Sequence, residues 1–334
     1  MKLDIVVPFY NEEECLNEFV GTLKSSLNKI SRISYTYYFV DDGSTDRSPE
    51  ILDALAKSDE RIYVIHLWGN HGHQKALIAG LDQCRGDAVL MMDGDGQHPA
   101  EAVVELIRVY LQNPDIAVVQ GIRGGRQQSL WKDWTSRSFY WIINKMVPET
   151  RIVPGSSDFR LINSDVLHLI RSYPDRHRNL RVLLASLKLP TIFIDYSPDL
   201  RLGGYSKYGW RKMVCLAADG LFAFSSFPLR INLFLMLVSG FLGIGYAIYS
   251  LVVYLKGQIV PGWTSTISLI ALLFCAMFGA LGIVSEYVSR IYEDVRQYPL
   301  YRIRPDRSST KQSREVPVHF LRKDGQKEGE EGIL

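Results

Sequence analysis

The chain has 334 residues and 47% of them are hydrophobic, so it can form one large domain or two smaller ones and is not disordered as a whole. Its formal net charge of +2 at pH 7 is too small to indicate a nucleic-acid-binding protein. The four cysteines lack a CxxC spacing and paired histidines, which argues against a zinc site or a disulfide framework and favours small buried side chains in a reducing compartment.

The first residues turn acidic within a dozen positions and lack a long apolar run, so we expect them to belong to the fold and not to a signal peptide. Five apolar runs are expected to be strands: 2–10, 35–42, 61–67, 87–93 and 116–122. Amphipathic stretches between them, such as 48–58 and 99–111, are expected to be helices. This alternation predicts an α/β fold with a mostly parallel sheet covered on both faces.

Each apolar run is followed by a polar cluster. Because ligands of such sheets bind beyond the carboxyl ends of the strands, we expect the clusters to converge on one crevice. After the fourth run, Asp93 and Asp95 flank a glycine and Gln97 follows, which offers the oxygen ligands that Mg²⁺ or Mn²⁺ prefers. On the residues alone, a capping turn before the helix near Pro99 is an equally good interpretation.

The clusters after the second and third runs suggest contacts to a nucleotide. Asp41 and Asp42 precede a turn, and one carboxylate is expected to accept a base N–H or a ribose hydroxyl. His71 and His73 lack a third metal ligand and are expected to be solvated or to bind phosphate. Lys75, at a helix start, can neutralise an anionic phosphate.

The C-terminal part has a different composition. Residues 231–255 contain no charged residue and are long enough to cross the roughly 30 Å hydrocarbon layer, and 265–285 repeat the pattern after a short connector. We therefore expect a two-helix transmembrane hairpin over 231–285, with a pair of buried soluble helices as the alternative. Basic residues gather outside the hairpin, against one in the connector, which places both ends in the cytoplasm: Arg211, Lys212, Arg230, Arg290, Arg296, Arg302 and Arg304, against Lys256.

Three further segments complete the expected organisation. Residues 206–230 are basic and aromatic and are expected to lie along the membrane surface, or else to pack on the soluble domain. Residues 286–305 are expected to form a helix beside the membrane. Residues 306–334 have few apolar side chains and are expected to be disordered.

Six segments carry a family resemblance: VVPFYNEEE, FVDDGSTD, NHGHQKALIAGLDQCRGDAVLMMDGDGQHP, GIRGGR, SSDFRLI and RLGGYSKYGWRKM. In this order they resemble the inverting family 2 glycosyltransferases that load a sugar onto a polyprenyl phosphate. The bacterial polyprenyl-phosphate glucosyltransferases with two C-terminal spans are the nearest group, and dolichol-phosphate mannose synthase and the undecaprenyl-phosphate aminoarabinose transferase are also similar. The resemblance covers residues 3 to 290, with Gly96 where many relatives have an aliphatic residue.

The resemblance implies a GT-A fold, a Rossmann-like domain over residues 1–205 followed by the hairpin, in a plasma-membrane protein whose catalytic domain and termini are cytoplasmic. It implies nucleoside contacts from Pro8, Tyr10, Glu12 and Asp42, a ribose or phosphate contact from Lys75, and a Mg²⁺ or Mn²⁺ site formed by Asp93, Asp95 and Gln97. Phosphate contacts are implied for a first group that can also be a solvated basic face: Arg123, Arg126, Lys132, Ser136 and Arg137. They are also implied for a second group that can equally be a basic loop on acidic lipid: Arg201, Ser206 and Lys207.

The implied activity is that of a metal-dependent hexosyltransferase with a nucleotide sugar and polyprenyl phosphate as substrates. UDP-glucose is the best choice of donor by similarity, GDP-mannose the second and a modified arabinose the third. A lipid phosphate is already anionic near neutral pH, so alignment and charge neutralisation matter more than a base. We assign Asp95 and Asp158 to catalysis; Asp158 would orient the phosphate or accept a remaining proton, and an ion pair with Arg160 that fixes the loop is the alternative.

Two other classes of protein share the early motifs. A processive polysaccharide synthase would need more membrane spans and a QxxRW-type motif, which this sequence lacks. A non-catalytic sugar-nucleotide sensor or scaffold would keep the nucleotide contacts and could lose the acidic pair. The relatives form homo-oligomers, and five glycines of the hairpin are expected to pack either between subunits or between the two spans: Gly240, Gly243, Gly245, Gly279 and Gly282.

Overall fold

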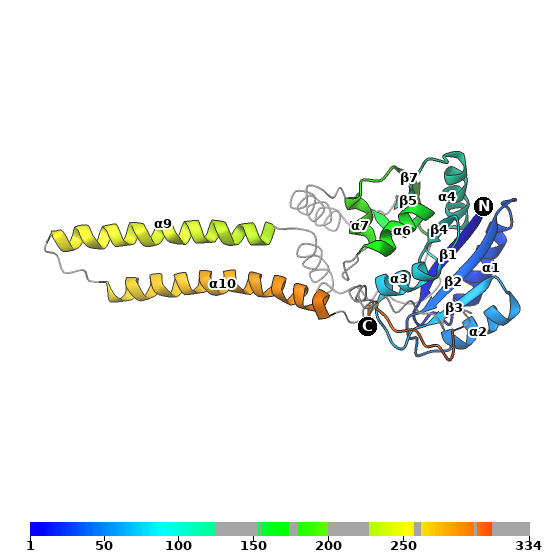
Figure 1. The fold of residues 1–334 in the computed structure, drawn as a ribbon, viewed down its shortest axis with the longest axis horizontal. Helices are drawn as coiled ribbons and strands as arrows, with labels where there is room; N and C mark the ends of the chain where they lie inside the picture. The colour runs from blue at the N-terminus through cyan, green and yellow to red at the C-terminus, as the bar shows by residue number, and fades with distance from the viewer. Residues whose placement is uncertain are drawn as a thin grey trace, which may run out of the picture.

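The structure is a computed structural model that describes residues 1–124, 153, 155–173, 180–199, 227–256, 262–296 and 299–308. An α/β domain forms the main body, and two long helices extend from it side by side (Figure 1).

A seven-stranded sheet forms the centre of the domain, in the order β3-β2-β1-β4-β6-β5-β7. Only β6 runs antiparallel to its neighbours, so the expected mostly parallel sheet is confirmed. The observed bounds of the five predicted strands lie within two residues of the expected ones, whereas β6 and β7 were not predicted. The strands are β1 (Lys2–Phe9), β2 (Ser34–Asp41), β3 (Ile62–His66), β4 (Ala88–Met91), β5 (Val118–Arg123), β6 (Ser156–Asn163) and β7 (Thr191–Tyr196).

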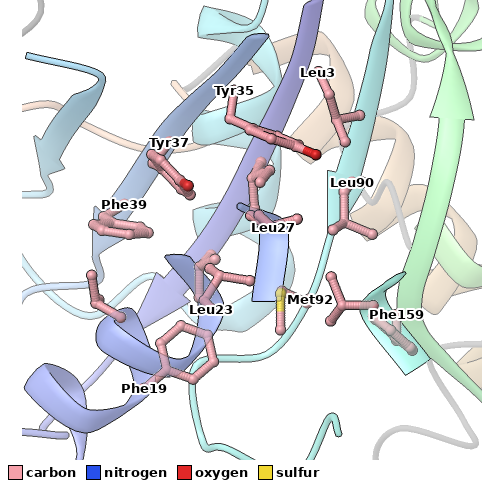
Figure 2. Close-up of a cluster of buried hydrophobic side chains, with 14 of the residues drawn as sticks. Leu3, Phe19, Leu23, Leu27, Tyr35, Tyr37, Phe39, Leu90, Met92 and Phe159 are labelled. Carbon is pink, nitrogen blue, oxygen red and sulfur yellow. The ribbon is translucent and has the colours of Figure 1, made fainter. Parts of the chain in front are cut away.

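Helices cover both faces of the sheet because the strand side chains alternate between them. In β1, Leu3, Ile5 and Val7 face a core shared with α1 (Leu16–Leu27), α2 (Ser48–Ser58) and α4 (Ala100–Gln112), part of which Figure 2 shows. Val6 faces the opposite core, which contains side chains from three other helices: α3 (His73–Gln83), α6 (Ser164–Ser172) and α7 (Leu180–Ser186). Both faces are therefore buried, as the apolar strands require.

The two long helices are α9 (Phe227–Leu255) and α10 (Trp263–Arg296), and they run antiparallel. Asn232 Nδ2 donates to the carbonyl oxygen of Ala280 at 3.0 Å, and the hydroxyls of Tyr246 and Thr266 lie 2.9 Å apart. Among the described residues, no helix is long and apolar enough to cross a membrane, and this includes α9 and α10.

The hairpin glycines do not mark a close contact between α9 and α10. A Cβ atom built on any of them would meet no described heavy atom within 4 Å beyond its own helix backbone and chain neighbours: Gly240, Gly243, Gly245, Gly279 and Gly282. Packing of one span on the other through these glycines, one of the two expectations, is therefore not what the described residues show.

The segment after α10 corrects two expectations. α10 ends at Arg296, and residues 299–308 are not helical, so no helix continues to residue 305. The same segment lies against the domain, where Ile303 pairs with Leu67 in an antiparallel bridge beyond the end of β3. Residues 306–308, expected to be part of a disordered tail, are ordered here, because Arg307 and Ser308 bond to the domain.

Candidate active site

The sheet brings five of the expected site residues together at the carboxyl ends of its parallel strands. Asp42 follows β2, Asp93 and Asp95 follow β4, Arg123 ends β5, and Asp158 lies near the start of the reversed strand β6. Because the start of an antiparallel strand lies beside the ends of its parallel neighbours, all five residues lie at the same end of the sheet. The predicted convergence of the polar clusters is thus present in the fold.

Asp93 lies at the centre of this group. Its Oδ1 is 3.0 Å from His73 Nε2, and its Oδ2 is 3.3 Å from His98 Nε2 and 3.5 Å from a guanidinium nitrogen of Arg123. Burial favours the protonated acid, but the hydrogen bonds from His73 and His98 hold the pKa of Asp93 well below its usual range. Asp93 is therefore a carboxylate in a cationic surrounding.

Asp158 is almost fully buried and has four donors around it. Gln74 Nε2 donates to it at 2.7 Å, Arg160 lies at 3.2 Å, and His73 and Arg181 each lie at 3.5 Å. Burial opposes ionisation, yet the hydrogen bond from His73 and the charges of Arg181 and Arg160 lower the pKa of Asp158 to about 2. The ion pair with Arg160, the structural alternative for Asp158, is present, and Arg160 itself is only 2% exposed.

His73 lies at the start of a helix and not in the expected loop, and its side chain is still 40% exposed. It is the first residue of α3, and its Nε2 reaches both Asp93 and Asp158. Burial favours the neutral ring, but the hydrogen bonds to these two carboxylates raise the pKa of His73 to about 10. A positive charge therefore joins the acidic turn after β4 to the start of β6.

Asp42 shapes the loop that precedes α3. Its two oxygens accept the backbone N–H groups of His71 at 2.8 Å and Gly72 at 2.9 Å. Burial raises the pKa of Asp42, and these two bonds oppose the rise. Gly43 has a φ of 69°, and a Cβ there would overlap the backbone of Gly69, so glycine is required at this turn.

The expected nucleoside contacts at the end of β1 lie beside this turn. Tyr10 is 38% exposed, whereas Pro8 is buried within β1. Glu12 Oε2 accepts a hydrogen bond from the thiol of Cys15 at 3.3 Å. Lys75 is exposed in the first turn of α3. None of these contacts tests nucleoside binding, which stays a prediction.

The acidic turn after β4 is held against the end of β1. A Cβ at Gly94 would lie 2.5 Å from the ring of Phe9, so only glycine allows this approach. The backbone N–H of Gln97 donates to Asp95 Oδ1 at 3.1 Å. The described residues contain no group of three or more His, Cys, Asp or Glu side chains that could hold a metal by themselves.

Several side chains that the sequence did not single out complete the site. His98 stacks on Phe159 with ring centroids 4.3 Å apart and bonds to Asp93; its place in DGDGQHP, next to the acids, was an available signal. Gln74 and Arg181 surround Asp158, and no local motif marks Arg181. Seven expected phosphate contacts lie outside the described residues: Arg126, Lys132, Ser136, Arg137, Arg201, Ser206 and Lys207.

Comparison with known proteins agrees with this architecture. The model of the family described as Glycosyl transferase family 2 matches residues 4–171. An uncharacterized glycosyltransferase of Synechocystis sp., sll0501, is 33% identical over 305 residues, which cover 91% of this chain and 95% of that protein. The bactoprenol glucosyl transferase of Shigella phage SfX is 32% identical over 308 residues, which cover 91% of this chain and 99% of that protein.

Among solved structures, the match to the mannosyltransferase PcManGT from Pyrobaculum calidifontis, in complex with GDP-Man and Mn²⁺, has 19% identity and a TM-score of 0.47, and it covers 66% of this chain and 63% of that one. The assignment rests on the family model and the sequence relatives, which together span the sheet, the acidic turn and the long helices. The chain belongs to glycosyl transferase family 2 and is a glycosyltransferase with the Rossmann-like GT-A fold.

Proposed function

We propose that the protein transfers glucose from UDP-glucose, with inversion, to a polyprenyl phosphate at the cytoplasmic face of the plasma membrane. The observation that carries this proposal is the match to bactoprenol glucosyl transferases over 91% of the chain, which includes the two long helices as well as the domain. Asp42, Asp93, Arg123 and Asp158 are grouped at the carboxyl ends of the parallel strands. This grouping supports a site where a sugar donor and an anionic acceptor meet.

The acidic turn fits a divalent cation that is shared with the donor. Mg²⁺ is usually bound by one or two carboxylates together with substrate phosphates, so a cluster of three protein ligands is not needed. Asp93, Asp95 and Gln97 would hold Mg²⁺ or Mn²⁺ through oxygen atoms. When bound, the cation would neutralise the charge that builds on the leaving diphosphate.

Basic side chains of the site would also neutralise negative charge on the substrates. Arg123 and His73 both contact Asp93, and Arg181 lies beside Asp158, each with part of its side chain exposed. They would reduce the repulsion between the donor diphosphate and the acceptor phosphate, which attacks as an anion. Asp158 accepts from several donors already, so an orienting role through His73 and Arg181 fits it better than proton abstraction.

The long helices would place this site near the lipid. We propose that they form a transmembrane hairpin with both chain ends in the cytoplasm, although no helix meets the criterion for a span over the described residues alone. The support is that the full sequence 231–255 is uncharged and that described apolar side chains of both helices are exposed. Phe241 is 75% exposed on α9, and Phe278 is 61% exposed on α10. Lipid tails would cover these side chains, and the phosphate of a polyprenyl lipid would lie at the same level as the domain.

Incubation of the purified full-length protein with radiolabelled nucleotide sugars and polyprenyl phosphate tests the proposal. Label from UDP-glucose should enter the organic phase only when Mg²⁺ or Mn²⁺ and the lipid phosphate are present, and the Asp95→Asn variant should lose this transfer. Transfer from GDP-mannose instead would refute the choice of donor. Label in a polymer would indicate a processive synthase, and nucleotide binding without any transfer would indicate a sensor.

A further inference from the structure

Residues 299–308, which we call the strap, bind the domain at the free edge of β3. Trp68 N–H donates to the carbonyl oxygen of Arg302 at 2.9 Å, and the N–H of Arg304 donates to the carbonyl oxygen of His66 at 2.7 Å. Ile303 packs against the core on the α3 side of the sheet. Since the strap starts three residues after the end of α10, it connects the hairpin directly to the edge of the sheet (Figure 1).

Side chains continue this contact into the domain. Arg307 donates through Nε to Asp53 Oδ2 at 2.9 Å and through Nη2 to Glu50 Oε1 at 2.8 Å, both on α2. The other oxygen of Asp53 lies 3.0 Å from Nε2 of His66. A single guanidinium of the strap thus fixes the carboxylate that meets the His66 ring.

The chain of contacts ends at the turn after β2. Nδ1 of His66 lies 2.9 Å from Asp41 Oδ2, and Asp41 Oδ1 accepts the backbone N–H of Ser44 at 2.9 Å. His66 is only 1% exposed and Asp41 only 3%, so neither has water to replace a lost partner. Asp42, the next residue, bonds to the loop before α3. The strap therefore reaches the turn that carries Asp42 through three successive side-chain contacts.

We propose that Arg307 is a positioning residue, and that the chain Arg307–Asp53–His66–Asp41 couples the strap, and through it the membrane hairpin, to the nucleoside-binding turn 41–45. The effect on catalysis rests on the proposed function, in which Asp42 contacts the donor nucleoside. An exposed ion pair alone is worth little, because water replaces it. Here the pair is joined to a buried histidine, so its loss should loosen the turn.

Hydrogen–deuterium exchange of the full-length, nucleotide-free protein tests the coupling directly. In Arg307→Ala the amide of Ser44 should exchange about 2- to 30-fold faster than in the wild type, which corresponds to the range by which substitutions within such a contact network typically change the coupling. Arg302→Ala is the matched control: it removes a positive charge from the strap, whereas the contact that Arg302 makes to Trp68 uses only its backbone oxygen. Equal exchange of Ser44 in the two variants would overturn the proposal.

Kinetics give the second readout. If the wild type is active on UDP-glucose, Arg307→Ala should raise KM for the donor by the same factor. Its kcat should stay within about twofold of the wild type, and KM for the lipid should not change. A fall in kcat at unchanged KM for the donor would contradict a positioning role. Asp53→Asn tests the same chain from α2 if Arg307→Ala does not fold. Because the exchange measurement needs no nucleotide, an inactive wild type would refute the proposed function and leave the coupling to be judged by exchange alone.

Discussion

At the scale of single residues, the site is an alternation of buried carboxylates and cations. Arg160 and Asp158 are both nearly inaccessible to water, and Arg160 keeps its Nε without a hydrogen-bond partner. Burial lowers the pKa of the Arg160 guanidinium to about 10, even though Asp158 acts in the opposite direction. Removal of Asp158 would leave Arg160 as a buried charge without its ion-pair partner, so stability and catalysis must be separated when Asp158 is tested.

Asp158→Asn is expected to lower both stability and turnover. Loss of one partner of a buried ion pair costs about 3–5 kcal/mol, which a thermal melt of the variant will show. Turnover should fall about 100-fold because His73 and Arg181 lose the carboxylate that orients them. The double variant Asp158→Asn/Arg160→Met should regain stability and remain slow. If the double variant regains its rate together with its stability, Asp158 is only structural.

A second carboxylate, far from the site, predicts how stability changes with pH. Asp59 lies 2.8 Å from Lys24 and 2.9 Å from Arg61, and the hydrogen bonds from Arg61 hold its pKa well below the usual range. Since the folded-state pKa is depressed, the stabilisation is fully present above about pH 4, the ordinary pKa of the unfolded chain, and is lost as the pH falls further. The ion pairs of Asp59 therefore stabilise the folded protein at neutral pH and lose this effect in acid.

Melting temperatures of the wild type and Asp59→Asn at pH 7, 5 and 3 check this expectation. The variant should melt lower at pH 7 and pH 5, and the gap should narrow at pH 3. Glu60→Gln, at the exposed neighbouring position, is the control and should show a small gap at every pH. A gap that widens in acid would contradict the assigned sign.

At the scale of elements, α3 lies close on the sheet because of one glycine. A Cβ at Gly80 would overlap the Cγ1 of Val6 in β1 and lie 3.1 Å from Val40 in β2. Both neighbours are short, branched and fully buried, so neither can move aside. The approach also positions His73, because Gly80 and His73 belong to the same helix.

Gly80→Ala and Gly21→Ala make a matched pair of helix substitutions. Alanine is favoured over glycine in a helix by about 1 kcal/mol, which should raise the melting temperature at Gly21 in α1, where the added Cβ meets nothing within 4 Å. At Gly80 an overpacking cost of about 1–3 kcal/mol should outweigh this gain and lower the melting temperature. Stabilisation by both substitutions would show that α3 does not require the close approach.

The elements also show what the sequence can and cannot predict. The first five strands were predictable because apolar runs between helices are strong signals, and the crevice followed from their polar ends. β6 was missed because Asp158 and Arg160, both buried, interrupt its apolar pattern. The strap was missed because its composition is polar, and its order depends on Asp53 and His66, which are far away in the sequence.

At the scale of the whole molecule, the chain meets the domain at both edges of the sheet. β7 is the last strand that the structure describes before α9 and forms one edge, whereas the strap lies at β3, which forms the other. The bonds of the strap to β3 and α2 restrict tilting of the domain at the edge that they hold. If the long helices span the membrane as proposed, this attachment would keep the site at a fixed height for the proposed lipid acceptor.

The proposed topology predicts the reactivity of single cysteines. Cys275 lies in α10 and is exposed in the structure, so in water it would react with a maleimide, whereas in hydrocarbon the reactive thiolate would not form. In a variant whose other cysteines are alanine, Cys275 should therefore resist a membrane-impermeant maleimide until the protein is denatured. Labelling of Cys275 in disrupted membranes as fast as that of a cysteine introduced at the exposed position Ser58 would contradict insertion of the hairpin.

Two single-cysteine variants test the orientation of the hairpin in a background in which all native cysteines, including Cys275, are replaced by alanine. Lys256→Cys, at the connector end of α9, should be labelled in intact cells because the positive-inside rule places the connector outside. Ser58→Cys, on the exposed end of α2, should be labelled only after the cells are broken. The reverse pattern would place the domain outside the cell, away from the cytoplasmic nucleotide sugar that the proposed reaction requires.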